Sequence, residues 1–281
     1  MILVIGGTGY VGRFLVKRLL GQGEPFRCLV RKSSDTSQLA RLGVPFVYGD
    51  LEEVRSIAAA LSGVEEVISL APIRLAEGFV RTCAGSEVRR AMFLSSTRRF
   101  SKVPSRSVDE VIRGEEVVRR CPVDSTVLRP TMIYGPGQDR NMDRLKQYLR
   151  KYRVISVPGD GNSLQQPVYV GDVIGAMEAA LRSDRTANRS YNIAGACPLT
   201  YNEMIDIVAD AIGVKVVKVH IPMGVFLVLV KLYGRLRSSP EVMVEQILRL
   251  NEDKCFDLRN AAQDFGYRPL CFEEGIRRTL S

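Results

Sequence analysis

The chain has 281 residues, enough for one large α/β domain or for such a domain with a smaller lobe. Its 46% hydrophobic and 25% charged residues are ordinary for a folded globular protein. No apolar run reaches the roughly 18 to 20 residues of a membrane span, and no basic segment precedes the first apolar residues, as it would in a signal peptide. These features exclude an integral membrane protein, and we expect a cytoplasmic one.

The net charge is +9, and the basic excess is divided between the two halves of the chain. We therefore expect no nucleic-acid partner, and the charge instead favours a phosphorylated cofactor or substrate. The six cysteines are scattered without a C-x-x-C pair, and His220 is the one histidine. This pattern predicts no metal site and fits a reducing compartment.

An apolar run at residues 2–5 is followed by Gly6-x-x-Gly9-x-x-Gly12 and by apolar residues at helical spacing up to Gly21. A strand, a glycine loop and a helix in this order are typical of the turn that binds a dinucleotide, although a purely structural glycine turn is the alternative. Glycines let the backbone approach the pyrophosphate, and the free N–H groups of the helix N-terminus stabilise its charge. The residues predicted to hold the cofactor in this loop are Gly6, Thr8, Gly9, Tyr10, Val11 and Gly12.

The second expected strand, residues 26–30, ends in Arg31-Lys32-Ser33-Ser34. An enzyme that uses NAD wants an acidic residue near this point to accept a hydrogen bond from the ribose 2′-hydroxyl. A guanidinium suits a 2′-phosphate instead. Arg31 and Lys32 therefore favour NADP(H) over NAD(H), whereas a solvated basic turn and the nearby Asp35 support the opposite interpretation.

Short apolar strands and helices then alternate along the first half of the chain. We expect strands at 44–48, 66–70, 91–94 and 125–128, and helices at 52–61, 75–85 and 108–120. This alternation predicts right-handed βαβ units and a doubly wound parallel Rossmann sheet of the α/β class. The expected nucleotide-binding domain covers 1–155 and is rejoined at about 165–195, and 196–281 form a small mixed α/β lobe for a substrate or partner.

The second half carries a basic helix expected at 140–152, a return to the sheet at 168–170 and a helix capped by Asp172. Thr200 and Glu203 have the spacing of a capping box, and a strand is expected at 214–219. The following stretch, 223–233, is apolar on every side and too short to span a bilayer. It is a buried helix of the lobe, a lid over an apolar substrate, or a docking surface for a protein or a membrane, to which the basic Lys231, Arg235 and Arg237 are suited.

Several motifs together resemble the extended or atypical short-chain dehydrogenases/reductases. They are Gly-Gly-Thr-Gly-Tyr-Val-Gly (6–12), Gly-Asp-Leu (49–51), Leu-Ser-Ser-Thr (94–97), Leu-Arg-Pro-Thr-Met-Ile-Tyr-Gly (128–135), Pro-Val-Tyr-Val-Gly-Asp-Val (167–173) and Phe-Gly-Tyr-Arg-Pro (265–269). The resemblance implies that Asp50 and Leu51 flank the adenine and that Ala71 and Pro72 lie along the nicotinamide ribose. It places Thr97 on the catalytic Ser/Thr and adds Ser95 and Pro130 to the cofactor contacts.

The family's usual chemistry requires a Tyr-x-x-x-Lys pair on one helical face, where the lysine lowers the tyrosine pKa. None of the ten tyrosines has a lysine four residues on. Aligned on Glu116, the tyrosine position falls on Val108 or Asp109 and the lysine position on Ile112 or Arg113. Thr97, Asp109 and Tyr134 remain as catalytic candidates, and Arg113 as a group that holds ribose or phosphate.

Two hypotheses of different class follow. The first is an NADP(H)-dependent reductase of a hydrophobic or quinone-like molecule, and the second is a non-catalytic NADP(H)-binding structural or redox-sensing protein. The sequence is most similar to the group of the NADPH-binding accessory subunit of respiratory complex I, which implies a protein partner for the second. A sugar-nucleotide epimerase or dehydratase is a third hypothesis. A homodimer through helices beside the fourth and fifth strands is a further expectation.

Overall fold

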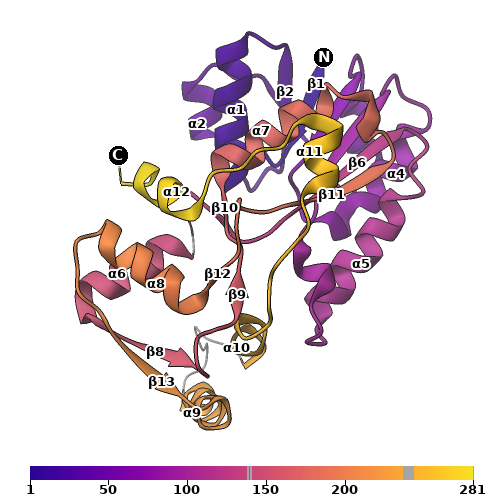
Figure 1. Ribbon diagram of the computed structural model, residues 1–281. Coiled ribbons are helices and arrows are strands. Elements are labelled where there is room, and N and C mark those ends of the chain that lie inside the picture. Colours follow the sequence, from indigo (N-terminus) through magenta and orange to yellow (C-terminus); the bar gives the residue numbers. More distant parts are fainter. Residues whose placement is uncertain (138, 140, 237–243, 281) are drawn as a thin grey trace.

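A seven-stranded, wholly parallel sheet dominates the computed structural model, which describes residues 1–137, 139, 141–236 and 244–280 (Figure 1). The strand order is β11-β6-β5-β4-β1-β2-β3. The strands are β1 (Ile2–Ile5), β2 (Phe26–Val30), β3 (Phe46–Tyr48), β4 (Glu66–Ser69), β5 (Arg90–Leu94), β6 (Asp124–Pro130) and β11 (Arg189–Ile193). The order of the first six is that of the doubly wound dinucleotide-binding fold, so the expected Rossmann architecture is confirmed.

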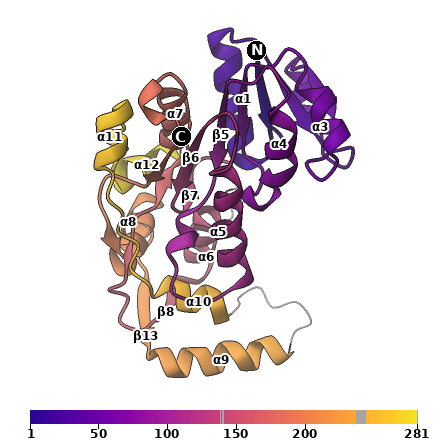
Figure 2. The same cartoon turned by 90° about the vertical axis from the view of Figure 1, so that its right-hand side faces the viewer.

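Helices cover both faces of this sheet (Figure 2). On one face α1 (Tyr10–Gln22) contacts α7 (Val170–Leu181), and α11 (Arg259–Phe265) packs beside α7 and β11. The other face carries α3 (Val54–Ala60), α4 (Ala76–Cys83) and α5 (Arg106–Val118), and the short α2 (Ser37–Arg41) follows β2. All four residues of β1 are buried. The unbroken apolar runs of the strands thus reflect a sheet that is covered on both sides.

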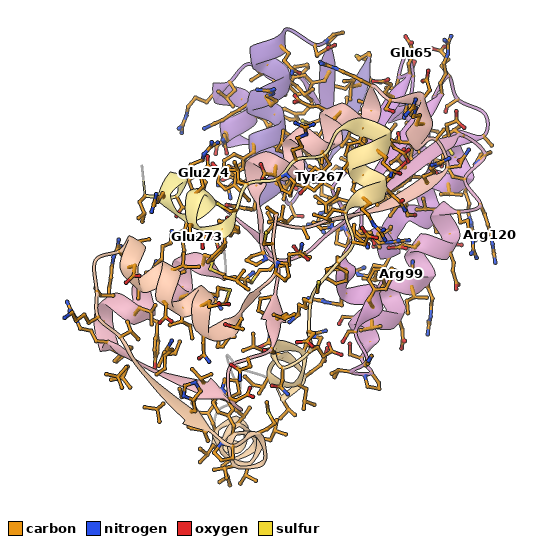
Figure 3. The ribbon with its side chains drawn as sticks, viewed as in Figure 1. Glu65, Arg99, Arg120, Tyr267, Glu273 and Glu274 are labelled. Carbon is orange, nitrogen blue, oxygen red and sulfur yellow. The ribbon has the colours of Figure 1, made fainter. Side chains whose placement is uncertain are left out.

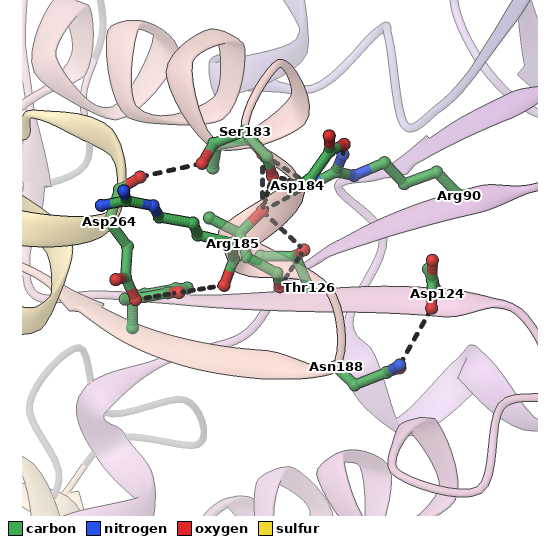
Figure 4. Close-up of polar contacts among 11 residues, drawn as sticks. Arg90, Asp124, Thr126, Ser183, Asp184, Arg185, Asn188 and Asp264 are labelled. Carbon is green, nitrogen blue, oxygen red and sulfur yellow. Dashed lines mark hydrogen bonds and ion pairs between the residues drawn. The ribbon is translucent and has the colours of Figure 1, made fainter.

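Polar side chains fix the last strand and the helices beside it (Figure 4). Arg90 donates to the carbonyl of Ala180 at 2.9 Å, at the end of α7. Tyr191 of β11 donates to Asp264 of α11 at 2.7 Å. These bonds replace water partners for buried polar groups and hold the returning chain against the sheet.

The small lobe is built on a parallel ribbon of β8 (Val154–Pro158) and β13 (Val217–Ile221). Around it lie α6 (Met142–Tyr152), α8 (Tyr201–Ala211), α9 (Met223–Leu236), α10 (Val244–Leu250) and α12 (Phe272–Arg278). Its core includes Met142 and Leu149 of α6 and Ile155 and Val157 of β8. The lobe thus takes in α6 and the first residues of β8, which lie in the range 1–155 expected for the nucleotide-binding domain. Helix α11, expected in the lobe, packs on the main sheet instead.

Two short pairings connect the two parts. They are β7 (Ile133–Tyr134) with β10 (Val168–Tyr169), and β9 (Leu164–Gln165) with β12 (Leu199–Thr200). The expectation that residues 168–170 return to the main sheet is therefore wrong, because β10 pairs with β7 alone. Tyr267 lies between the two parts (Figure 3), and its hydroxyl donates to the carbonyl of Ala194 at 2.8 Å.

The helix caps were predicted with mixed success. The capping box of Thr200 and Glu203 is present at the start of α8, as expected. Asp172 does not cap α7, because the cap residue is Tyr169 and the Asp172 carboxylate accepts from the N–H of Leu270 at 2.9 Å. The basic helix begins at Met142, and Arg140 and Arg237 lie outside the described residues.

The apolar stretch 223–233 forms most of α9, and none of its described side chains is buried. A buried lobe helix is therefore excluded for these residues. In both views α9 is the outermost element of the lobe, at the end far from β1 (Figures 1 and 2). No helix in the described ranges is long and apolar enough to cross a membrane.

Candidate functional site

The glycine loop between β1 and α1 leaves one glycine open and packs another tightly. Gly6 has a positive φ of 86°, which favours glycine, and its carbonyl accepts from the N–H of Gly9 at 3.0 Å. A Cβ on Gly12 would lie 2.2 Å from the Gly6 oxygen, so the helix can approach the loop only without a side chain there. A Cβ on Gly9 would meet nothing closer than that same oxygen, at 3.3 Å. Gly9 therefore faces open space at the N-terminus of α1, where an anion is stabilised.

The remaining residues of the predicted loop differ in their surroundings. Thr8 is half-buried and lines a pocket beside the loop. The hydroxyl of Tyr10 donates to the carbonyl of Pro136 at 3.3 Å, and burial raises its pKa. Val11 packs against the core between the sheet and α7. Tyr10 thus ties the loop to the segment after β7.

That pocket contains a cation that the sequence analysis missed. Its lining residues are Gly7, Thr8, Arg13, Asp35, Gln38 and Leu39. Arg13 lies directly after Gly12 on α1, and Asp35 lies beyond the tip of β2. Arg31 and Lys32, at that tip, are exposed and are not among the lining residues. The signal for Arg13 was its position one residue after the glycine motif.

The adenine contacts implied by the resemblance lie after β3. Asp50 is half-buried, and its carboxylate accepts from the N–H of Glu52 at 3.0 Å. Leu51 is buried in the core on the α3 side of the sheet. Asp50 thus shapes the turn that enters α3, at the carboxyl edge of the sheet where ligands of this fold bind.

A second pocket lies at the carboxyl ends of β4 and β5. It is lined by Leu70, Ala71, Pro72, Ile73, Arg74, Leu94, Ser95, Ser96, Arg98, Ser107, Glu110 and Val111. A Cβ on Gly6 would lie 3.3 Å from the backbone of Leu70 and Ala71, so this pocket adjoins the glycine loop. Ala71, Pro72 and Ser95, which the resemblance assigns to the cofactor, thus line one pocket, and this pocket combines an apolar wall with a polar rim.

Helix α5 presents a different face to this pocket from the one expected. Ser105 caps the helix by accepting from the N–H of Val108, which fixes its first turn. Ser107, Glu110 and Val111 line the pocket. Asp109 and Arg113 are exposed and are not among the lining residues. The structure thus does not bring these two predicted site residues to the pocket.

Two charges on the rim have different surroundings. Glu110 is paired with Arg74 at 3.4 Å and with Arg106 at 2.8 Å. Arg98 has no ionic partner in the described part of the chain. Partial burial, with the Arg249 charge nearby, lowers its pKa. Arg98 is therefore a cation available to an anionic group of a ligand.

Behind Ser95 lies a buried carboxylate. The side chain of Glu115 is 5% exposed, and it accepts from Arg129 at 2.7 Å and from Ser95 at 2.5 Å. Arg99, which lies beside α5 in Figure 3, is a third partner. These bonds satisfy a carboxylate that would be costly to bury alone, and they fix the end of β5 relative to α5.

The remaining predicted residues are buried. Thr97 is 8% exposed, and its hydroxyl donates to the carbonyl of Pro130 at 3.2 Å. It lies between Ser96 and Arg98 of the pocket lining without being part of that lining. Tyr134 is 1% exposed in the core of the small lobe, where it packs against Tyr169 and Phe272. Burial raises the pKa of Tyr134, so it is unsuited to donate a proton at neutral pH.

The residues at the sheet edge fit a nicotinamide dinucleotide. Gly9 leaves room for a pyrophosphate that a Cβ would fill, and the N-terminus of α1 supplies free N–H groups. The pocket with Thr8 and Arg13 lies toward β2, where this fold places the adenine ribose, and the second pocket lies toward β5, on the nicotinamide side.

Comparison with known proteins agrees with the observed fold. The model of the NmrA-like family matches residues 1–257. The 2-alkyl-3-oxoalkanoate reductase of Stenotrophomonas maltophilia is 24% identical, with 99% of this chain and 97% of the relative covered. Subunit 9 of the NADH dehydrogenase [ubiquinone] 1 alpha subcomplex of Arabidopsis thaliana is 28% identical, covering 74% of this chain and 57% of that subunit. Among solved structures, the dTDP-glucose 4,6-dehydratase of Streptomyces venezuelae with bound NAD has a TM-score of 0.77 at 19% identity, covering 99% and 95% of the two chains. At that identity the likeness concerns the fold.

Proposed function

The chain belongs to the NmrA-like family of atypical short-chain dehydrogenases/reductases, and from this premise we propose that it is an NADP(H)-dependent reductase of a hydrophobic carbonyl compound. Quinones and enones are the substrate classes that the proposal covers. The observation that supports it best is the second pocket, whose wall is apolar and whose place is beside the glycine loop. The name of the Stenotrophomonas relative, a reductase of an alkyl-bearing keto acid, agrees with such a pocket.

The side chains that α5 presents to the second pocket determine which substrates this site could reduce. Ser107 and Val111 are four residues apart and both line the pocket, so they stand where a Tyr-x-x-x-Lys pair would face the nicotinamide. Neither side chain can pass a proton at neutral pH, and Glu110 is held by two arginines. A quinone or enone takes up hydride to give a delocalised anion that water can protonate afterwards, so it needs no such group. Oxidation of a free alcohol and its reverse, the reduction of a simple ketone, do need one.

Different residues of the chain would bind the cofactor, bind the substrate and stabilise charge on it. Gly6, Gly9 and the N-terminus of α1 hold the pyrophosphate, and bound NADPH supplies the hydride. The apolar wall of Leu70, Ile73 and Val111 binds the substrate and excludes water from one side of it. Arg98 attracts an acidic or carbonyl oxygen of the substrate, and electron density that arrives on this oxygen is stabilised by the nearby charge. Of the three catalytic candidates, only Thr97 lies next to this pocket, where its bond to Pro130 positions Ser96 and Arg98.

We further propose that the cofactor is NADP(H). Arg13 in the first pocket and Arg31 and Lys32 at the end of β2 favour a 2′-phosphate, and Asp35 opposes it. Charge-assisted hydrogen bonds of about 1 to 3 kcal/mol would give NADPH a roughly five- to hundredfold lower Kd than NADH. Arg13→Ala and Arg31→Ala should reduce this ratio, and Lys17→Ala, an exposed residue of α1 outside the pocket lining, should leave it unchanged. Equal affinities for both cofactors in the wild type would refute the preference.

Turnover is tested by following the oxidation of NADPH with quinones and enones. Val111→Phe should fill the pocket and abolish turnover while NADPH still binds. Arg113→Ala, on the solvent side of the same helix, is the matched control and should change neither. If Arg113→Ala weakens NADPH binding and Val111→Phe is active, our assignment of the α5 face is wrong.

The second candidate is a protein that holds NADP(H) without turnover, in an assembly with another protein. Two observations favour it, namely the absence of a proton donor among the pocket-lining residues that the structure describes and the similarity to a subunit of a respiratory NADH dehydrogenase. Purified protein that retains nucleotide but oxidises it with none of these acceptors would support this candidate over the reductase. A sugar-nucleotide epimerase or dehydratase is the third candidate, and we expect no turnover of UDP- or dTDP-sugars.

A further inference from the structure

Helix α9 has two faces, and both are apolar. Met223, Phe226, Leu227 and Val230 recur at helical spacing and are partly covered. The opposite face is exposed, with Val225 at 53%, Val228 at 56%, Leu229 at 51% and Leu232 at 49%. Clustered apolar side chains of this size rarely face water in a protein without a partner. The exposed face of α9 is therefore a candidate docking surface.

The ribbon that leads into α9 has the same character. Ile155 and Val157 of β8 point into the lobe core, so alternate residues point outward. Val217 is 61% exposed and pairs with Val154, which is 45% exposed, and Val219 is 46% exposed. β13 ends at Ile221, two residues before α9 begins, so the outer face of the ribbon adjoins the helix. We call the ribbon, the end of α6 before it and α9 after it the lobe tip.

The net charge of the chain resides in the segments that form the lobe tip. Residues 144–159 contain five Lys or Arg and no acidic residue, and residues 211–236 contain four and none. The rest of the chain carries 31 residues of each sign, so these two segments account for the whole net charge of +9. Both segments lie in the second half of the chain, where acidic residues elsewhere offset their charge.

Several of these cations are available to a partner. Lys146 and Lys218 pair with Asp143 and Asp206. Four others near the start of the ribbon are exposed and have no acidic partner in residues 1–137, 139, 141–236 and 244–280, namely Arg150, Lys151, Arg153 and Lys215. Lys151 lies over the ring of Tyr152, which is 52% exposed. Exposed aliphatic side chains, an exposed tyrosine and unpaired cations thus occur together.

We propose that the lobe tip binds the surface of an anionic lipid bilayer, with α9 lying flat in the interface. Apolar side chains inserted at the level of the headgroups, flanked by cations that attract anionic lipids, form the usual chemistry of such a contact. A helix of 14 residues is about 21 Å long, which suits a position in the plane of the interface. The nucleotide-binding sheet then faces away from the membrane (Figure 2).

Charge complementarity decides between this surface and a second copy of the chain. A symmetric dimer through the tip would bring identical patches together, and each patch carries only basic residues within the two segments. The resulting repulsion opposes self-association, whereas an anionic bilayer is attracted by the same charges.

Flotation with vesicles tests the proposal on the full chain. Wild type should float with vesicles of equal parts phosphatidylglycerol and phosphatidylcholine, and at least tenfold less with phosphatidylcholine alone or in molar salt. Leu229→Glu and the pair Arg150→Glu/Lys151→Glu should each reduce binding at least tenfold, because each basic residue near the surface contributes about fivefold. The matched controls lie on the nucleotide-binding domain, which in our proposal does not touch the bilayer. They are Val54→Glu, an exposed valine of α3, and Arg119→Glu/Arg120→Glu at the end of α5, where Figure 3 shows Arg120. Both should bind vesicles as wild type does.

The binding of NADPH by every variant reports that the fold is intact. The proposal is overturned if wild type binds neither kind of vesicle, if it binds both equally at any salt, or if the tip variants bind as well as the controls. It is also overturned if wild type is a dimer by light scattering that Leu229→Glu dissociates, because a second copy would then cover α9. Since none of these readouts involves turnover, failure here leaves the proposed reductase untouched.

Discussion

The glycine loop allows nucleotide binding and folding to be separated by three substitutions of the same kind. A valine at position 9 adds a side chain where only the Gly6 oxygen is near, at 3.3 Å, and the backbone at Gly9 has an ordinary φ of −74°. The expected cost in folding free energy is about 1 kcal/mol, because valine caps a helix less well than glycine but can adopt this extended backbone. The same side chain occupies the approach of the pyrophosphate. Loss of two charge-assisted hydrogen bonds of about 1.5 to 3 kcal/mol each raises the Kd for NADPH by at least about 10²-fold.

Two matched substitutions in the same helix complete the test. A Cβ at Gly12 would lie 2.2 Å from the Gly6 oxygen and 2.7 Å from the Gly7 backbone, and backbone atoms cannot yield as a flexible side chain does. Gly12→Val should therefore destabilise the fold by about 1 to 3 kcal/mol or more. A Cβ at Gly21 meets nothing within 4 Å, so Gly21→Val should leave both properties nearly unchanged.

The assay pairs isothermal titration with NADPH and thermal unfolding without nucleotide. We expect Gly9→Val to lose NADPH binding while its Tm is nearly unchanged. Gly12→Val should have a lower Tm, and Gly21→Val should keep both its NADPH affinity and its Tm. A folded Gly9→Val that binds NADPH as tightly as wild type would show that the loop is only structural, and the proposed cofactor site would fall with it.

Three further predictions concern buried polar groups. Arg129→Ala should lower the unfolding free energy by about 3 kcal/mol, because it leaves the buried Glu115 carboxylate without this partner. Arg259→Ala breaks an exposed ion pair and should lower it by less than about 1 kcal/mol. Similar losses for both variants in chemical denaturation would contradict this difference. Burial lowers the pKa of Lys254 to about 8, whereas the unfolded value is about 10.4. Between these values the unfolded chain binds the proton that the folded protein has released, so the unfolding free energy should rise with pH by about 3 kcal/mol in the wild type but not in Lys254→Met. The thiols of Cys83 and Cys121 lie 3.7 Å apart and their hydrogen bond lowers the pKa of Cys121, so mild oxidation should form a disulfide between them and leave buried Cys28 reduced, as peptide mapping would show.

The nucleotide-binding half was predictable because its signals are local. Strand, glycine loop and helix follow one another within 22 residues, and the buried parallel strands read as short apolar runs that recur along the chain. The limits of β2 and the capping box of α8 agree with the structure for the same reason. Arg13 was missed because its role depends on the distance from β2, a strand that the chain reaches only later.

The features that could not be predicted depend on contacts between residues far apart in the sequence. Asp172 has the residue type and position of a helix cap, yet its carboxylate accepts a hydrogen bond from the backbone N–H of Leu270, almost a hundred residues away. The apolar periodicity of α9 is equally compatible with a core position and with a surface, because only packing against other elements distinguishes them. Likewise, the basic residues of segments 144–159 and 211–236 lie on one surface only because β8 pairs with β13.

An ambiguity of one residue in the alignment of α5 changes which side chains are predicted to face the nicotinamide. Two consecutive glutamates, 115 and 116, offer two alignments of the helix, and the choice of Glu116 directs residues 108, 109, 112 and 113 to the nicotinamide. In the structure Glu116 is exposed, and Glu115 is the buried partner of Ser95 and Arg129. One residue turns a helix by about 100°, so the pocket face becomes Ser107 and Val111, and the candidates Asp109 and Arg113 turn to solvent. Because the new pair is a hydroxyl and an aliphatic side chain, the shift strengthens the argument that chemistry at this site needs an acceptor that takes hydride without help from a protein acid.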